Sequence, residues 1–337
     1  MIVWIGYQGN FFLSAGIMSV NMLLFFIFRK ELIAAGNTID RHFIGLQTWM
    51  AFVIGSCLAL GSLYWLFSHL ETGKYVIYSI GVLAIAYFIL EICRASAAYR
   101  FKMGSVLIVI FILMVFYFYY GQMNTSMNIY AINLMDDQLL GFIPFRPESS
   151  SAFNPLWCCL LGSPLVFAYQ WLEKRGVSPS IPSKFSVAFV FSAVAFFLLG
   201  LSARYIGENG KIAAEWIVVV HLFQAIAELI VGALGAGYIF EMVPRHLSAF
   251  AIGVKSVALS LSSLVAAVIS TKIALPERHA ITPEAMSAIY SEYFLNLAVV
   301  AVIMAGITLA LSRVITCLVK KGENLEANQQ MKQAKAY

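Results

Sequence analysis

Long apolar runs, separated by short polar or Pro/Gly-containing breaks, dominate the hydropathy pattern of the chain. A helix needs about 20 mostly apolar residues to cross a bilayer. The pattern therefore predicts nine membrane-spanning helices, over residues 9–28, 43–69, 75–93, 103–131, 152–172, 185–205, 213–241, 247–273 and 292–319. No basic region precedes the first run and no small-residue cleavage site follows it, so it is predicted to be a bundle helix and not a secretory signal.

Composition supports the same class of protein. Hydrophobic residues make up 61% of the 337 residues and charged residues only 12%, about half of the roughly 25% usual in soluble domains. With a mean hydropathy of +0.83, an ordinary soluble domain is excluded. The net charge of +5 comes from cations at the ends of spans, which indicates membrane topology and not a nucleic-acid partner. The five cysteines lie in apolar segments and are predicted to be buried free thiols.

The Lys and Arg residues predict an orientation. Fourteen fall in one set of loops, and six in the alternate set: Lys74, Arg146, Arg204, Lys211, Lys272 and Arg278. Cytoplasmic loops carry the excess of Lys and Arg. The tail after Lys320 is therefore predicted to be cytoplasmic, which places Met1 outside.

One carboxylate is predicted deep inside a span. Glu228 lies thirteen residues after Glu215, about 20 Å along a helix. A lone carboxylate at that depth is costly and usually functional, so Glu228 is predicted to be a substrate or proton site, with a purely structural buried ion pair as the alternative. His221, seven residues earlier, is predicted to be a hydrogen-bonded packing residue. Glu91 is predicted to form a structural pair with Arg94.

A cation is predicted near this carboxylate. Lys255 lies about 12 Å inside the next helix. Small residues let consecutive helices approach closely, and here they are Gly232, Gly235, Ala236 and Gly237. We therefore predict that Lys255 and Glu228 face one cavity, within ion-pair or one-water reach. The alternative is that Lys255 reaches the membrane surface.

Polar groups also interrupt the span 103–131. Gln122, Asn124, Thr125, Ser126 and Asn128 follow a run of aromatic residues and suit a wet cavity lined by hydrogen-bonding groups. In the next span Asn154 precedes Pro155, which is predicted to interrupt the helix and leave a carbonyl free beside the Asn side chain. No catalytic, nucleotide-binding or metal-binding motif occurs, so neither an enzyme nor a cofactor is predicted.

Several separated segments resemble one family. FYYGQMNTSMNIYAIN, SAFNPLWCCLLGSPLVFAYQWLEKRG and HLFQAIAELIVGALGAGYIFEMVPRHLSAFAIG are similar to segments of the proton-dependent oligopeptide transporters, in the bacterial di- and tripeptide permease branch of the major facilitator superfamily. The resemblance covers most of residues 9–315. It implies an all-α polytopic membrane protein with this division: 1–30, family helix six; 31–100, a linker with an extra helical hairpin; 101–320, the C-terminal six-helix bundle; 321–337, a cytoplasmic tail.

The family likeness also implies a function. It implies a symporter of di- and tripeptides driven by the proton gradient, in the bacterial inner membrane, with lipid around it. Asn154 and Glu228 would hold the amino terminus of the peptide, and Glu228 would also couple to protons. Residues predicted to line the substrate site are Asn154, Glu228, Gln122, Lys255, Tyr117, Asn124 and Ser126.

The chain departs from the family pattern in two ways. Gly121, Tyr117 and Lys255 stand where the family often has glutamate, tryptophan and tryptophan, which puts the substrate range in question. Helices one to five, with the E-x-x-E-R segment and the residues that bind the peptide carboxylate, have no counterpart. We therefore expect the chain to be inactive without an N-terminal bundle, which is either part of a longer chain or a separate polypeptide. The alternative is a non-transporting membrane remnant or scaffold.

Overall fold

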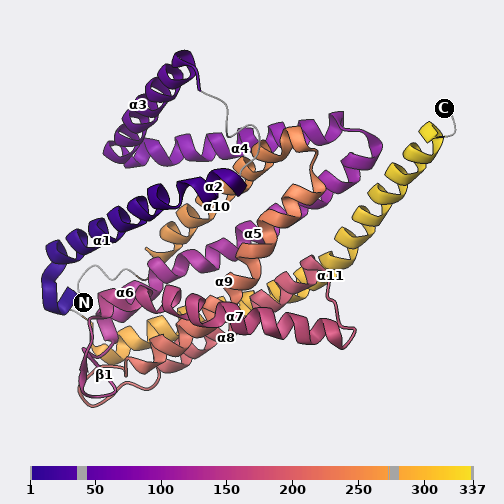
Figure 1. Ribbon diagram of the computed structural model, residues 1–337. Coiled ribbons are helices and arrows are strands. Elements are labelled where there is room, and N and C mark those ends of the chain that lie inside the picture. Colours follow the sequence, from indigo (N-terminus) through magenta and orange to yellow (C-terminus); the bar gives the residue numbers. More distant parts are fainter. Residues whose placement is uncertain (1, 36–43, 272, 274–280, 335–337) are drawn as a thin grey trace. The chain divides into compact units, whose positions relative to one another are not determined.

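The computed structural model describes residues 2–35, 44–271, 273 and 281–334, and Figure 1 shows its elements. Among the Lys and Arg residues counted above to predict orientation, Arg41, Lys272, Arg278 and Lys335 lie outside these residues. The chain divides into two compact units, Met1–Val76 and Ile77–Tyr337. Each unit is described by itself.

The first unit consists of lipid-exposed helices. It holds α1 (Ile2–Ile27), α2 (Arg29–Ala35), α3 (Leu46–Ser68) and the beginning of α4 (Leu70–Arg94). Gly6, with φ of 66°, kinks α1 near its start, a conformation that a residue without a side chain adopts freely. No residue of α3 is buried. Such a helix buries its apolar side chains in lipid and not in a protein core.

The second unit is a helical bundle. After α4 it comprises α5 (Ala97–Asn124), α6 (Ser126–Leu134), the 3₁₀-helix η2 (Pro147–Ala152), α7 (Phe153–Lys174), α8 (Ile181–Ser202), α9 (Glu215–Met242), the 3₁₀-helix η3 (Arg245–Leu247), α10 (Ser248–Ser270) and α11 (Pro283–Ala334). A two-stranded antiparallel hairpin, β1 (Gln138–Leu139) with β2 (Ile143–Pro144), lies in the loop before η2.

The predicted spans are confirmed. Within the part of the chain that the structure describes, nine helical stretches are long and apolar enough to cross a membrane. Their bounds follow the predicted ones to within about six residues, except that the last helix begins at Pro283, before the predicted start, and continues past the predicted end to Ala334. The all-α polytopic class is therefore established. The assignment of segments 1–30, 31–100, 101–320 and 321–337 to parts of the family stays a prediction.

Helix α8 forms the centre of the bundle and packs between α9 and α11. Ser186 Oγ donates to the Ala305 carbonyl at 2.7 Å, and Ser291 Oγ donates to the Gly200 carbonyl at 2.9 Å. From the first pair to the second, the residue number rises along α8 and falls along α11, so the two helices are antiparallel. A Cβ on Gly200 would lie 2.8 Å from Leu295 Cγ, and the glycine therefore sets how closely the two helices approach.

The span predicted over 103–131 is not one continuous helix. It breaks at Thr125, whose φ of −115° and ψ of −94° end α5 before α6 begins. Thr125 Oγ1 donates to the Gly121 carbonyl at 3.0 Å. Hydroxyl side chains can bond to the backbone of the preceding turn and compete with the helical pattern. The break therefore falls within the polar cluster that the sequence marks.

The close approach predicted between α9 and α10 is wrong. A Cβ on Gly235 would meet Leu113 of α5 at 3.1 Å, whereas one on Gly232 or Gly237 would meet nothing within 4 Å. Helix α10 packs mainly against α5, where a Cβ on Gly121 would lie 2.9 Å from Ala266 Cβ. The small residues therefore do not join α9 to α10.

Two smaller predictions have opposite outcomes. The pair of Arg94 with Glu91 is confirmed, with 3.2 Å between Nη1 and Oε1. The cysteines are free thiols as predicted, but they are not buried: Cys57, Cys93, Cys159 and Cys317 are exposed and Cys158 is half-buried. Apolar spans place residues on the lipid-facing surface as often as in the core, which the sequence pattern alone does not separate.

Candidate functional site

A hydrogen bond between two distant helices forms the centre of the candidate site. The side chain of Asn154, 3% exposed in the first turn of α7, donates from Nδ2 to Glu228 Oε2 of α9 at 2.6 Å. Cys158 lies one turn further along α7, with its Sγ 3.6 Å from the same oxygen. Residues four apart share a helix face, so α7 presents both side chains to one carboxylate.

Pro155 plays a different role from the predicted one. It lies in the first turn of α7, directly after η2, where its missing N–H has no helical partner in any case. The proline therefore begins the helix and does not interrupt it. Pro164 is the proline inside α7, and its ring removes a backbone donor in mid-helix.

Two tyrosines of α5 complete the surroundings of Glu228. Tyr117 and Tyr120 both interact electrostatically with its carboxylate. Their rings contact each other edge to face, with centroids 5.8 Å apart. Glu228 is half-buried and makes no ion pair with any described residue.

The hydrogen-bond acceptors that remain free around Glu228 indicate which ligands this cluster of residues can bind. Asn154 Oδ1 is buried and has no partner among the described residues, and the Glu228 carboxylate is an acceptor without a cation. A carboxylate, an amide oxygen and aromatic rings are the groups that bind an ammonium ion. The arrangement can therefore take a primary amine, or a proton on Glu228.

The direct ion pair predicted between Lys255 and Glu228 does not form. The ion pairs within the described ranges are Lys74–Glu71, Arg94–Glu91 and Lys102–Glu326. Glu228 lies fourteen residues before the end of α9, and Lys255 seven after the start of α10, so their depths differ by about 10 Å. Asn154 donates a hydrogen bond to the carboxylate instead. A water-bridged pair stays a prediction.

Gln122 and Ser126 belong to a second polar group. Gln122 is fully buried, and its Oε1 accepts from Tyr293 Oη at 2.8 Å and from Ser126 Oγ at 2.5 Å. This group joins the α5–α6 break to α11. No recorded contact connects it to Glu228.

The seven predicted residues therefore separate into four sets. Asn154, Glu228 and Tyr117 meet around one carboxylate, and Gln122 and Ser126 meet at α11. Asn124 is exposed at the end of α5, and Lys255 is half-buried on α10. Sequence reasoning missed Cys158, Tyr120 and Tyr293. Cys158 lies four residues after Asn154 and Tyr120 three after Tyr117, so helical spacing could have found both. Nothing in the sequence links Tyr293 to Gln122.

His221 is buried as a packing residue, but without the predicted hydrogen bond. It is fully buried in α9, and neither ring nitrogen has a partner in the described part of the chain. Its ring lies 6.5 Å from that of Phe153. Gln224, one turn further along, also has an unpartnered buried amide nitrogen.

Comparison with known proteins places this chain in a family. A sequence model of the POT family matches residues 2–312. Dipeptide and tripeptide permease A of Pectobacterium carotovorum is 28% identical over 300 residues, which are 89% of this chain and 58% of the relative. The permease A of Chromobacterium violaceum is 28% identical over 307 residues, or 91% of this chain and 61% of the relative.

Solved structures share the fold. Tetrameric PepTSo2 matches with a TM-score of 0.76 and 21% identity, over 93% of this chain and 64% of that one. A bacterial homologue of the human drug peptide transporters PepT1 and PepT2 matches with a TM-score of 0.73 and 20% identity, over 95% and 64%. The chain thus spans about three fifths of the length of the curated relatives.

Proposed function

The chain belongs to the POT family, and on that basis we propose that it is the carboxy-terminal portion of a proton-coupled symporter of di- and tripeptides. The family consists of membrane transporters and not of enzymes. The observation that carries the proposal is the hydrogen bond from Asn154 to Glu228, which holds a carboxylate in mid-membrane without a paired cation. The curated relatives are named as dipeptide and tripeptide permeases.

In this proposal Glu228 binds the amino terminus of the peptide. The ammonium group would donate to the Glu228 carboxylate and to Asn154 Oδ1, with the rings of Tyr117 and Tyr120 beside it. A cationic amine placed there replaces the water that such a buried carboxylate would otherwise need. The same carboxylate can take up a proton in place of the amine. Competition between the two couples peptide binding to protons.

Transport further requires a second bundle. The relatives' remaining two fifths match no part of this chain, and transporters of this superfamily rock two bundles about a shared site. We propose that Glu228 and Asn154 supply the amine-binding half of the site and that an amino-terminal bundle supplies the other half.

An uptake assay tests the proposed function. We expect liposomes containing this chain alone to show no proton-driven uptake of labelled dialanine. We expect uptake when the amino-terminal helices of the Pectobacterium permease A are fused before residue 2. Accumulation by the chain alone would contradict the need for a second bundle. A correctly inserted fusion that binds and moves no peptide would favour the alternative, a non-transporting scaffold.

We also propose that the chain lies in the bacterial inner membrane with its tail in the cytoplasm, because Lys and Arg collect on that side. In a cysteine-free background, we expect Glu148→Cys to react with an impermeant thiol reagent added to intact cells. Asn328→Cys should react only after the cells are opened. The reverse pattern of labelling would overturn the orientation.

A further inference from the structure

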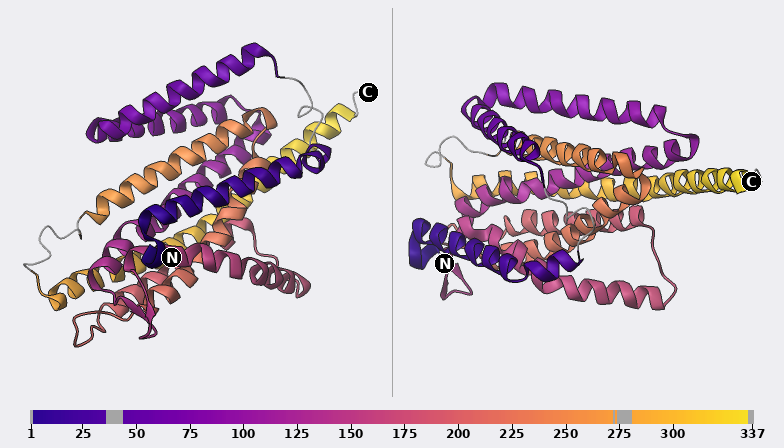
Figure 2. Two further views of the ribbon diagram at one scale, coloured as in Figure 1. Left: turned by 60° about the vertical axis from the view of Figure 1, so that its left-hand side comes forward. Right: turned by 45° about the horizontal axis from the view of Figure 1, so that its top comes forward.

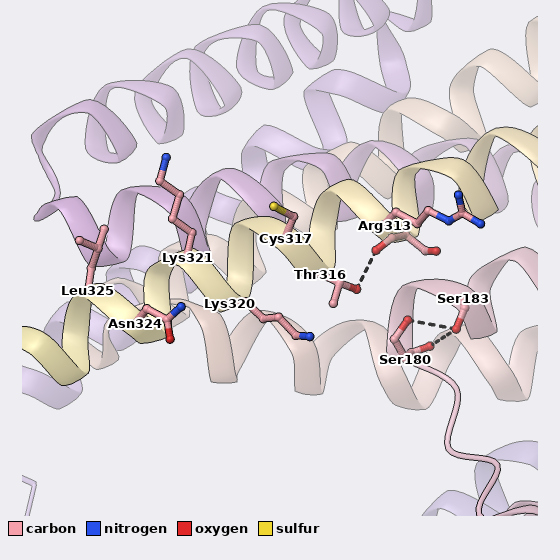
Figure 3. A pocket seen from close by; sticks show the side chains of 10 residues that line it. Ser180, Ser183, Arg313, Thr316, Cys317, Lys320, Lys321, Asn324 and Leu325 are labelled. Atoms are coloured by element: carbon pink, nitrogen blue, oxygen red, sulfur yellow. Dashed lines mark hydrogen bonds between the residues drawn. The ribbon is translucent and has the colours of Figure 1, made fainter.

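A groove outside the candidate site gathers unpaired cations. It lies between the start of α8 and the second half of α11, with a volume of about 940 Å³. Its walls are Ser180, Ser183, Ser312, Arg313, Thr316, Cys317, Lys320, Lys321, Asn324 and Leu325, and Figure 3 shows these side chains. No carboxylate lines the groove.

Two of the cations have no partner in the described structure. Arg313 and Lys320 are exposed, seven residues apart on one face of α11, and neither makes an ion pair or lies over an aromatic ring. Neighbouring cations are already occupied: Lys321 lies 4.3 Å from the ring centroid of Phe101, and Lys184 lies 4.5 Å from that of Tyr169. Figure 3 shows Lys320 reaching toward the start of α8, while Lys321 points to the other side.

Acidic residues do not neutralise the groove. Glu241 and Glu323 line an adjoining hollow that shares Ser180, Thr316 and Lys320 with the groove, but neither forms an ion pair with Lys320. Glu326 is paired with Lys102. The charge at Arg313 and Lys320 is therefore available to an external anion.

The groove lies where two helices leave the membrane. The predicted apolar run of α11 ends at Val319 and Lys320 follows, and the apolar run of α8 begins after Lys184. Arg313 lies about 10 Å deeper than Lys320, among the exposed apolar side chains Ile307 and Val314. An arginine at that depth turns its head toward the interface, where phosphate groups lie.

We propose that this groove binds an anionic phospholipid. Its phosphate would lie between Arg313 and Lys320, beside the side chains of Ser180 and Ser183. The acyl chains would follow the exposed apolar faces of α8 and α11. Arginine forms two parallel hydrogen bonds to a phosphate, and lysine adds a point charge. Net negative charge on the headgroup is what distinguishes this ligand from a zwitterionic lipid.

Native mass spectrometry of the whole purified chain, titrated with phosphatidylglycerol or with phosphatidylcholine of the same acyl chains, tests the proposal. We expect tighter binding of phosphatidylglycerol. The double substitution R313Q/K320Q should weaken phosphatidylglycerol binding about ten-fold or more and weaken phosphatidylcholine binding much less, so that the preference between the two lipids is lost. The charge-preserving R313K/K320R should retain most of the preference.

A matched control separates a site from general attraction to the interface. R29Q/K30Q removes the same charges from exposed residues just past the apolar part of α1, and we expect it to change phosphatidylglycerol binding less than two-fold. Equal losses in the two double variants, or equal affinity of the unchanged protein for both lipids, would overturn the proposal. If R313Q/K320Q does not fold, Arg313→Gln alone should still weaken binding about three-fold.

Discussion

In the fusion with an amino-terminal bundle proposed above, Glu228→Gln should abolish the proposed preference for peptides with a free amino terminus. Glutamine keeps an oxygen that accepts from Asn154 Nδ2, so the contact between α7 and α9 survives. The negative charge that would bind an ammonium group is lost. Charge-assisted hydrogen bonds contribute about 1.5–3 kcal/mol, so dipeptide uptake should fall by about 10- to 100-fold.

The readout is the ratio of uptake of dialanine to that of N-acetyl-dialanine, in the fusion with an amino-terminal bundle described above. The fusion with Glu228 intact should favour the free amine strongly, and Glu228→Gln should transport both poorly and with a ratio near one. Glu241→Gln makes the same substitution at an exposed position at the end of α9 and should leave the ratio unchanged. A preserved preference in Glu228→Gln would remove Glu228 from the proposed amine site.

Asn154→Leu should have the second largest effect, on stability. Leucine resembles asparagine in shape but has no donor, so the Glu228 carboxylate loses its amide partner in a half-buried position. Leaving one partner of such a pair unsatisfied costs about 1–3 kcal/mol. Thermal unfolding of the purified chain in detergent should therefore shift to a lower temperature.

A double-mutant cycle identifies the cause of this loss. In the Glu228→Gln background the Asn154→Leu substitution should cost less, because a neutral amide is less expensive to leave unpaired than a carboxylate. Asn296→Leu, at an exposed position of α11, provides the same change of side chain without a buried partner and should be nearly neutral. An equal cost in both backgrounds would show that Asn154 stabilises the helix start by itself.

The membrane spans could be predicted from the sequence because hydropathy acts residue by residue. The break at Thr125 could not, since it depends on backbone dihedral angles that periodicity does not report. Pro155 was misread for a similar reason: a proline disrupts a helix interior but suits a first turn, and the pattern does not locate the helix start that closely. The packing of α10 against α5 in place of α9 depends on the tertiary structure. Several helices present faces of small residues, and the sequence does not say which of them pack together.

The candidate site was predictable in part. Mid-membrane carboxylates need partners, which marks Glu228, and the family resemblance marks Asn154. The partner predicted from charge was Lys255, but in the structure a neutral amide forms the direct contact, because α7 and α5 surround Glu228 and Lys255 lies at another depth. Charge complementarity in a sequence says which pairs are attractive and not which helices meet. Tyr120 and Cys158 enter the site only through those helix contacts.

The last helix connects the tail of the chain to the helices around Glu228. Helix α11 runs unbroken for 52 residues, about 78 Å, and its end projects beyond the other helices of its unit (Figure 2). The ion pair of Lys102 with Glu326 at 2.5 Å fastens this projecting part to the first turns of α5, the helix that carries Tyr117 and Tyr120. We expect tilting of either helix to displace the tail as well. A spin label at Met331, in the tail beyond the membrane span, would therefore report displacements of the helices that surround Glu228.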